Sequence, residues 1–140
     1  MAEAPAWAPL YPSGVSVDPP QVPASLVTAW ADRAAASPES PCLVYFDTVL
    51  TVRQVDADSD ALASHLQDRG VDRGDVVGIQ LQNIPQFAIA MLAVWKVGAT
   101  VLILNPMYRG GELRRLIDDS RAIGFIGLDP GFGGHEQHII

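Results

Sequence analysis

The fold is decided by residues 74–104, which read GDVVGIQLQNIPQFAIAMLAVWKVGATVLIL. The apolar run over 76–81 predicts a strand. Asn83 is expected to cap the next helix, which is apolar on nearly all sides and ends at Gly98. The continuous apolar run over 100–104 is typical of a strand in a parallel sheet with helices on both faces. The stretch therefore predicts a strand–helix–strand unit.

Two further helices are predicted on the N-terminal side of this unit. Thr51 and Gln54 have the spacing of a capping box, and the helix that follows ends at Gly70. Ser25 is expected to cap an earlier helix, which the Ser37-Pro38 pair ends. The side chains predicted to share one face are Leu26, Ala29, Trp30 and Arg33 on the earlier helix, and Val55, Ser59, Leu62 and Leu66 on the later one.

The remaining elements complete an alternation of strands and helices. Residues 42–46 and 49–50 are predicted strands, joined by a turn at Asp47-Thr48. Gly110-Gly111 opens a last helix with Leu113, Leu116 and Ile117 inward, and 123–128 returns as a strand. This order predicts an α/β fold, layered αβα, with a mainly parallel sheet and right-handed crossovers.

Three parts of the chain are expected from these patterns. Residues 1–24 form an extended, proline-rich arm. Residues 25–128 form a partial α/β subdomain. Residues 129–140 form a separate tail.

Composition excludes several classes of function. The 140 residues carry a net charge of -7, so binding to nucleic acid through phosphate neutralisation is not expected. The single cysteine, Cys42, permits no intrachain disulfide, and it favours a cytoplasmic location. The first basic residue is Arg33, so no secretory signal with a positive start is predicted.

An apolar run over 84–104 raises the alternative of a membrane span. Its length suits a bilayer, but Pro85 and Gln86 lie near one end and Lys96 lies inside. A central lysine costs about 3 kcal/mol on insertion scales. The run is better explained by a buried helix, a glycine stop and a buried strand, so an integral membrane protein is not expected.

Several side chains are candidates for chemistry, and each has a plainer interpretation. Asp56, Asp58 and Asp60 suggest a cation site, but alternation by two spreads them around a helix and favours a solvated face. His135 and His138, next to Glu136, hold a metal only with ligands from elsewhere. A disordered tail is the better interpretation of these residues.

The other candidates are single residues and one glycine-rich run. His65 is expected on a helix surface, and Cys42 is expected to be a small buried residue in a strand. Lys96, the only lysine, falls inside the buried-helix pattern. The run Gly131–Gly134 lacks a lysine, a Ser/Thr metal ligand and a following helix, so it is not expected to bind phosphate.

The chain resembles the superfamily of AMP-forming ligases, which includes acyl-CoA synthetases. The resemblance lies in three stretches that follow one another along the sequence: 51–79, 81–87 and 93–106. The first contains Gly70-Val71 and Gly74-Asp75 before a strand. The second reads Leu81-Gln82-Asn83-Ile84-Pro85-Gln86-Phe87, and the third carries Lys96, Gly98, Ala99, Asn105 and Pro106, followed later by Glu112-Leu113 and Asp119-Ser120. Tyr11-Pro12-Ser13-Gly14-Val15, Ser25-Leu26 and Asn105-Pro106-Met107-Tyr108 are similar to the long-chain fatty-acid–CoA ligase branch. The resemblance covers roughly residues 9–128 and implies part of the N-terminal subdomain of the adenylate-forming ligase fold. Residues 129–140 depart from the family pattern and are expected to form a non-family tail.

The resemblance also implies a chemistry. In the intact family, a carboxylate and ATP form an acyl-adenylate with the help of Mg²⁺, and the thiol of CoA displaces AMP. The family's residues for these steps are a Thr/Ser/Gly-rich loop ending in Pro-Lys-Gly, a Thr-Glu pair, a ribose-binding Asp and a lysine of a C-terminal domain. None of these motifs occurs in the 140 residues. We therefore expect no catalytic, cofactor-binding or metal-binding residue in this chain, and no ATP, Mg²⁺ or CoA bound by it.

The leading hypothesis is a truncated fatty-acid–CoA ligase that is inactive alone. An early stop, a frameshift near residue 129 or a cloned fragment each accounts for such a chain. The alternatives are a docking half of a split synthetase, which binds the missing remainder or itself, and a small membrane-associated protein.

The apolar strand over 101–104 also bears on stability. Each large apolar side chain left in water forgoes about 1.5–3 kcal/mol. A whole domain has only about 5–15 kcal/mol of stability. A chain that leaves several such side chains uncovered is predicted to be marginally stable or to self-associate.

Overall fold

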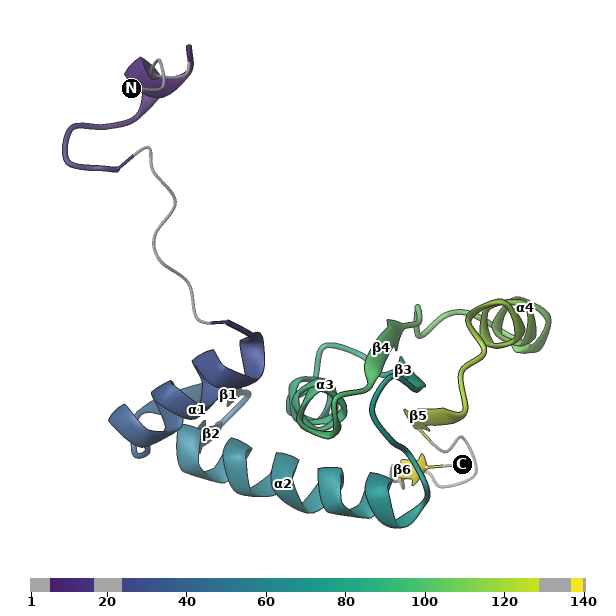
Figure 1. Ribbon diagram of the computed structural model, residues 1–140. Coiled ribbons are helices and arrows are strands. Elements are labelled where there is room, and N and C mark those ends of the chain that lie inside the picture. Colours follow the sequence, from purple (N-terminus) through teal and green to yellow (C-terminus); the bar gives the residue numbers. More distant parts are fainter. Residues whose placement is uncertain (1–5, 17–23, 129–136, 140) are drawn as a thin grey trace.

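The structure is a computed structural model, and it describes residues 6–16, 24–128 and 137–139. After a short 3-10 helix, η1 (Ala8–Leu10), the helices are α1 (Leu26–Ala36), α2 (Val52–Asp68), α3 (Pro85–Val97) and α4 (Gly110–Ser120). The strands are β1 (Pro41–Tyr45), β2 (Thr48–Thr51), β3 (Val76–Gln80), β4 (Thr100–Ile103), β5 (Gly124–Leu128) and β6 (Gln137–Ile139). Figure 1 shows their arrangement.

A parallel three-stranded unit forms the centre of the larger sheet. The strand order is β4-β3-β5-β6, in which β3 pairs in parallel with β4 and with β5, and β6 is antiparallel to β5. Strands β1 and β2 form a separate antiparallel hairpin. The α/β class and the mainly parallel sheet predicted from the sequence are therefore confirmed.

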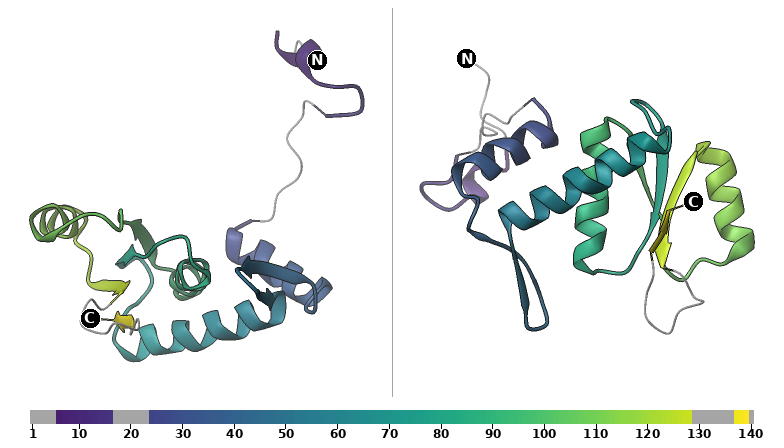
Figure 2. Two further views of the ribbon diagram at one scale, coloured as in Figure 1. Left: turned by 180° about the vertical axis from the view of Figure 1, so that it is seen from behind. Right: turned by 90° about the horizontal axis from the view of Figure 1, so that it is seen from below.

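Helices lie on both sides of this sheet. Helix α3 packs against α2 on one side, whereas α4 lies on the other side of the strands (Figure 1 and the right-hand view of Figure 2). The core lies between the sheet and the α2–α3 pair. Its fully buried members include Leu66, Val77, Ile79, Val94 and Ile126.

The capping signals position α1 and α2 as predicted. The Ser25 side chain accepts from the backbone N–H of Thr28. The Thr51 hydroxyl accepts from the N–H of Gln54, and the Gln54 side chain accepts from the N–H of Thr51, so the capping box is complete. Val55, Ser59 and Leu66 of α2 are buried, as its apolar period predicts.

The start of α3 differs from the prediction. Ile84, not Asn83, is the N-cap residue, and no side chain caps this end. The cause is Pro85, whose fixed φ and missing N–H suit the first helical position, so the residue before it becomes the cap. The end of α3 follows the prediction, since Gly98 adopts φ 86°, a left-handed conformation that glycine reaches without strain.

The β1–β2 turn lies one residue earlier than predicted. Tyr45 pairs with Thr48, so the two-residue turn consists of Phe46 and Asp47, with Phe46 at φ 48°. The Phe46 side chain is 85% exposed.

Strand β4 and helix α4 are less covered than their sequences predict. Strand β4 is the edge of the described sheet, and the Ile103 side chain is 63% exposed. Leu113, Leu116 and Ile117 of α4 face inward but are only half-buried. An apolar pattern indicates which side chains are buried in a complete fold. It does not indicate whether the residues that bury them belong to the described chain.

Both ends contain structure that was not predicted. In the arm, η1 interrupts the expected extended conformation, and the Trp7 and Tyr11 rings lie 5.3 Å apart. In the tail, β6 pairs with β5, where a disordered tail was expected. Within the described residues, no helix is long and apolar enough to cross a membrane, and the 84–104 run divides into α3, Gly98 and β4.

Candidate functional site

The connections of β3 and β4 leave the sheet toward opposite faces. Helix α3 follows β3 on one side and α4 follows β4 on the other (Figure 1). Where neighbouring parallel strands send their helices to opposite faces, the loops at their carboxyl ends separate and leave a crevice, which is the usual ligand position in open α/β sheets. A ligand site is therefore expected at the carboxyl ends of β3 and β4.

The structure has a crevice at this position. Its volume is about 640 Å³, within the range of small-molecule sites. Apolar side chains from β4 and α3, Ile103 and Phe87, meet the amides of Gln82 and Asn83 there. Its other lining residues are Leu81, Leu104, Asn105, Pro106, Met107 and Tyr108.

Gln80, the last residue of β3, shapes one wall of the crevice. Its Nε2 donates to the carbonyl oxygens of Asn105 and Tyr108, both at 3.0 Å. The Asn105 side chain accepts from the N–H of Met107 at 2.9 Å and closes a local turn. Together these bonds fix the loop after β4, although the Met107 side chain itself is 83% exposed.

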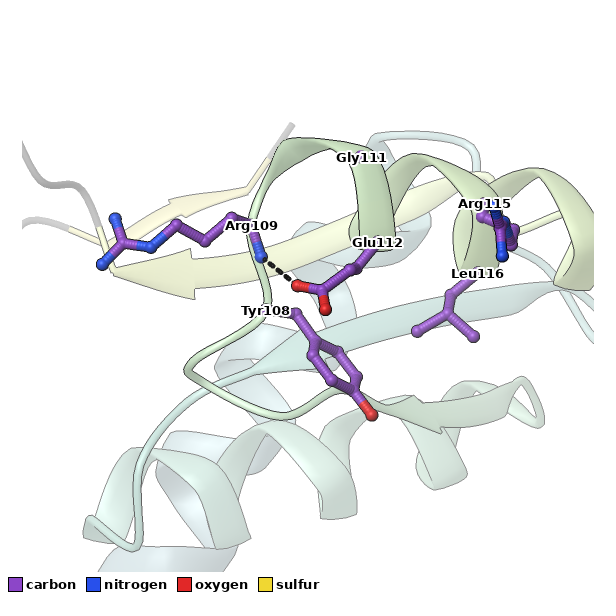
Figure 3. Close-up of a pocket in the computed structure, with 6 residues that line it drawn as sticks. All are labelled: Tyr108, Arg109, Gly111, Glu112, Arg115 and Leu116. Atoms are coloured by element: carbon purple, nitrogen blue, oxygen red, sulfur yellow. Dashed lines mark hydrogen bonds between the residues drawn. The ribbon is translucent and has the colours of Figure 1, made fainter.

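A second depression adjoins the crevice at the start of α4. Its volume is about 590 Å³, and Tyr108 lines both depressions. Figure 3 shows the Glu112 carboxylate accepting from the backbone N–H of Arg109, at 3.1 Å, while the Arg109 side chain extends away from Tyr108. The carboxylate satisfies a free N–H at the helix start, so this feature is explained by the stability of α4.

The crevice is suited to binding and not to phosphoryl chemistry. Of the described residues that line it, none carries a charge. Holding a nucleoside triphosphate and Mg²⁺ requires cations for the phosphates and oxygen ligands for the metal. The residues that line the crevice do not fit a nucleoside triphosphate with Mg²⁺.

Lys96, the sole lysine, is occupied in an ion cluster that joins α1, α2 and α3. Its Nζ donates to Asp56 Oδ1 at 2.7 Å and to Asp60 Oδ1 at 2.6 Å. Trp30 Nε1 donates to the same Asp56 oxygen at 2.7 Å. The Lys96 side chain is only 13% exposed, so its charge requires these partners.

The cluster sets the protonation of Asp56. Burial of the carboxyl by itself raises its pKa. The hydrogen bonds from Lys96 and Trp30, with the charge of Lys96, outweigh burial and hold the pKa below its ordinary value of 3.8. The carboxylate is therefore ionised as part of the packing between the helices.

This arrangement corrects the interpretation of the three aspartates as a solvated face. Asp56 and Asp60 are four residues apart, so they share one side of α2 and both reach Lys96, whereas Asp58 is exposed. Their partner lies about 40 residues away, which local patterning does not reveal. The role of Gln80 in holding the loop after β4 was not predicted from the sequence either. A polar residue at the end of an apolar parallel strand does indicate a position near a ligand site.

The other candidates are not brought together. His65 is exposed on α2, and Cys42 is half-buried in β1. His135, Glu136 and Gly131–Gly134 lie outside the described residues, as does the side chain of His138. Over the described ranges, no group of three or more His, Cys, Asp or Glu side chains is placed to hold a metal ion.

Comparison with known proteins identifies the family. The AMP-binding enzyme family matches residues 30–137, which is most of the chain. The chain belongs to the AMP-binding enzyme family. The resemblance seen in the sequence and the α/β ligase fold that it implied are thereby confirmed.

Two relatives in this AMP-binding family are fatty-acid–CoA ligases. The chain is 30% identical over 123 residues to the long-chain-fatty-acid–CoA ligase of Yersinia pestis, covering 86% of this chain and 22% of the relative. It is 43% identical over 94 residues to the medium/long-chain-fatty-acid–CoA ligase FadD6 of Mycobacterium tuberculosis, covering 67% of this chain and 16% of the relative. The chain thus spans about a fifth of the length of these relatives.

Solved structures agree with the fold of the AMP-binding family. The O-succinylbenzoate coenzyme A synthetase of Bacillus subtilis, in complex with AMP, is 28% identical with a TM-score of 0.68, over 74% of this chain and 27% of that one. The N-terminal subdomain of NpsA from Klebsiella oxytoca, in complex with anthranilyl-AMSN, is 25% identical with a TM-score of 0.71, over 79% of this chain and 29% of that one.

Proposed function

We propose that this chain is the N-terminal part of a fatty-acid–CoA ligase and has no ligase activity alone. The observation that carries the proposal is the family match over residues 30–137, with fatty-acid–CoA ligases among the relatives at 30% and 43% identity. The intact enzyme joins a fatty acid to CoA with ATP and Mg²⁺, through an acyl-adenylate. Because the single cysteine permits no intrachain disulfide, we propose a cytoplasmic location.

Within that enzyme, the chain contributes structure and one wall of a site. Its sheet presents the crevice at the carboxyl ends of β3 and β4, and Gln80 holds the loop that forms the crevice wall. The phosphate-binding and catalytic groups come from polypeptide beyond this chain. An uncharged crevice is consistent with that division, since it offers apolar contact but no charge stabilisation.

A chimera tests this proposal. Residues 30–128 of this chain replace the matching segment of FadD6, and ATP-dependent acyl-CoA formation is measured with fatty acids of several lengths. We expect the chimera to retain activity and the 140-residue chain to have none. The control is the same chimera with Val77→Asp and Ile79→Asp. Both side chains are fully buried, so two carboxylates there should disrupt the core and abolish activity.

Two results would overturn the proposal. The first is acyl-CoA formation by the 140-residue chain itself. The second is a chimera that folds and binds AMP as FadD6 does but forms no acyl-CoA with any fatty acid.

A further inference from the structure

The outer edge of β4 presents unpaired backbone groups. The N–H of Thr100 donates to the carbonyl of Asp75 at 2.7 Å, and the N–H of Leu104 donates to that of Ile79 at 2.9 Å. Because alternate residues of a strand point their backbone groups to the same side, Val101 and Ile103 point theirs away from β3. In the part of the chain that the structure describes, no strand lies on that side.

This edge lacks the features that keep natural edges from pairing. Charged side chains, prolines and bulges usually blunt an exposed edge. Strand β4 reads Thr-Val-Leu-Ile, its register with β3 has no shift, and Ile103 is 63% exposed. A regular, apolar edge of this kind is a template for another β-strand.

The lengths of the relatives indicate where that strand comes from. The chain covers only 29% of the NpsA N-terminal subdomain and 27% of the Bacillus subtilis synthetase. Most of the ligase subdomain is therefore polypeptide that this chain does not contain. A second copy is less favourable as the occupant, since each copy carries a net charge of -7 and two copies repel.

We propose that the outer edge of β4 binds a β-strand of the polypeptide that completes the ligase subdomain. The proposal rests on the proposed function and adds the surface and the mode of assembly. Backbone hydrogen bonds from Val101 and Ile103 supply the pairing, and the exposed Ile103 side chain supplies apolar contact.

Hydrogen exchange of individual amides tests the proposal directly. The chain is measured alone and then mixed with the part of FadD6 that follows the matched segment. Alone, the amides of Val101 and Ile103 should exchange quickly, while those of Leu102 and Leu104 are already protected by β3. In the complex, Val101 and Ile103 should become at least about tenfold slower to exchange, so that the alternation disappears.

A pair of variants at one position separates backbone pairing from side-chain contact. Ile103→Pro removes the outward N–H but leaves the bond from Leu104 to Ile79, so the chain should fold and bind the FadD6 piece about tenfold more weakly. Ile103→Thr is the matched control, because it keeps the N–H and the β-branched shape, and binding should change by less than about threefold.

Three outcomes would overturn the proposal: a complex that leaves the Val101 and Ile103 amides fast, equal binding by the Pro and Thr variants, or the same protection in a dimer of this chain alone. Exchange reports docking without requiring turnover. A mixture that forms acyl-CoA while the Val101 and Ile103 amides still exchange quickly would therefore contradict the proposed strand pairing. It would leave the proposed function intact.

Discussion

At the scale of residues, the ion cluster around Lys96 shows most clearly what the sequence predicts and what it does not. The sequence predicts that Lys96 lies on a buried helix, and it does. The sequence does not reveal which groups neutralise the buried charge of Lys96. Asp56, on α2, accepts from Lys96 and from Trp30 of α1, and both residues are far from Lys96 along the chain. Long-range charge pairing depends on how helices pack, so local patterns do not predict it.

Replacing Lys96 should destabilise the chain. Lys96→Met keeps the length of the side chain but leaves Asp56 without its main partner, and we expect a loss of about 1–3 kcal/mol in the free energy of unfolding. Urea titration followed by Trp fluorescence measures the change. Asp60→Asn is the control, since the Asp60 side chain is 64% exposed and its pairing should contribute less than about 1 kcal/mol.

The same cluster predicts a dependence on pH. The pKa of Asp56 is lower in the folded chain than its ordinary value of 3.8, so its contribution is fully present above 3.8 and is lost as pH falls through the folded pKa. The stability difference between the natural chain and Asp56→Asn should be constant from pH 5 to 7 and shrink below about pH 3.8. A difference that grew on acidification would contradict the lowered pKa.

At the scale of elements, local chemistry predicts helix ends well where the capping residue has no competitor. Thr51 and Gln54 form the predicted capping box, and Gly98 ends α3. Asn83 fails as a predicted cap because Pro85 fixes the helix start one residue later. The apolar run of β4 predicts a covered strand, but cover depends on neighbouring polypeptide, which a local pattern does not contain.

Two alanine substitutions test this account of the caps. Thr51→Ala removes the hydroxyl that accepts from the Gln54 N–H and should cost about 1 kcal/mol of stability. Asn83→Ala removes a side chain that caps nothing and should change stability by less than about 0.5 kcal/mol. Equal losses at the two positions would show that the assigned start of α3 is wrong.

At the scale of the whole molecule, the described residues bury a core on one side of the sheet and leave large apolar side chains exposed elsewhere. The α2–α3 side buries Leu66, Val77 and Ile79, whereas Phe46, Ile103 and Met107 are more than 60% exposed. Exposed apolar surface of this kind marks an interaction site or a tendency to aggregate.

We expect the isolated chain to show this incompleteness in solution. Its thermal unfolding should shift with protein concentration, because weak association covers exposed apolar side chains away from the β4 edge, such as Phe46. Differential scanning calorimetry over a hundredfold range of concentration measures the shift. A sharp and reversible transition at the same temperature throughout that range would show that the chain is a self-sufficient domain.

The most direct test of the central claim is reconstitution of a ligase from two pieces. The 140-residue chain is mixed or co-expressed with the part of FadD6 that follows its matched segment, and ATP-dependent acyl-CoA formation is measured with CoA and a fatty acid. We predict that neither piece is active alone and that the mixture forms acyl-CoA. A stable complex without any acyl-CoA formation, or full activity of the FadD6 piece without this chain, would contradict the account.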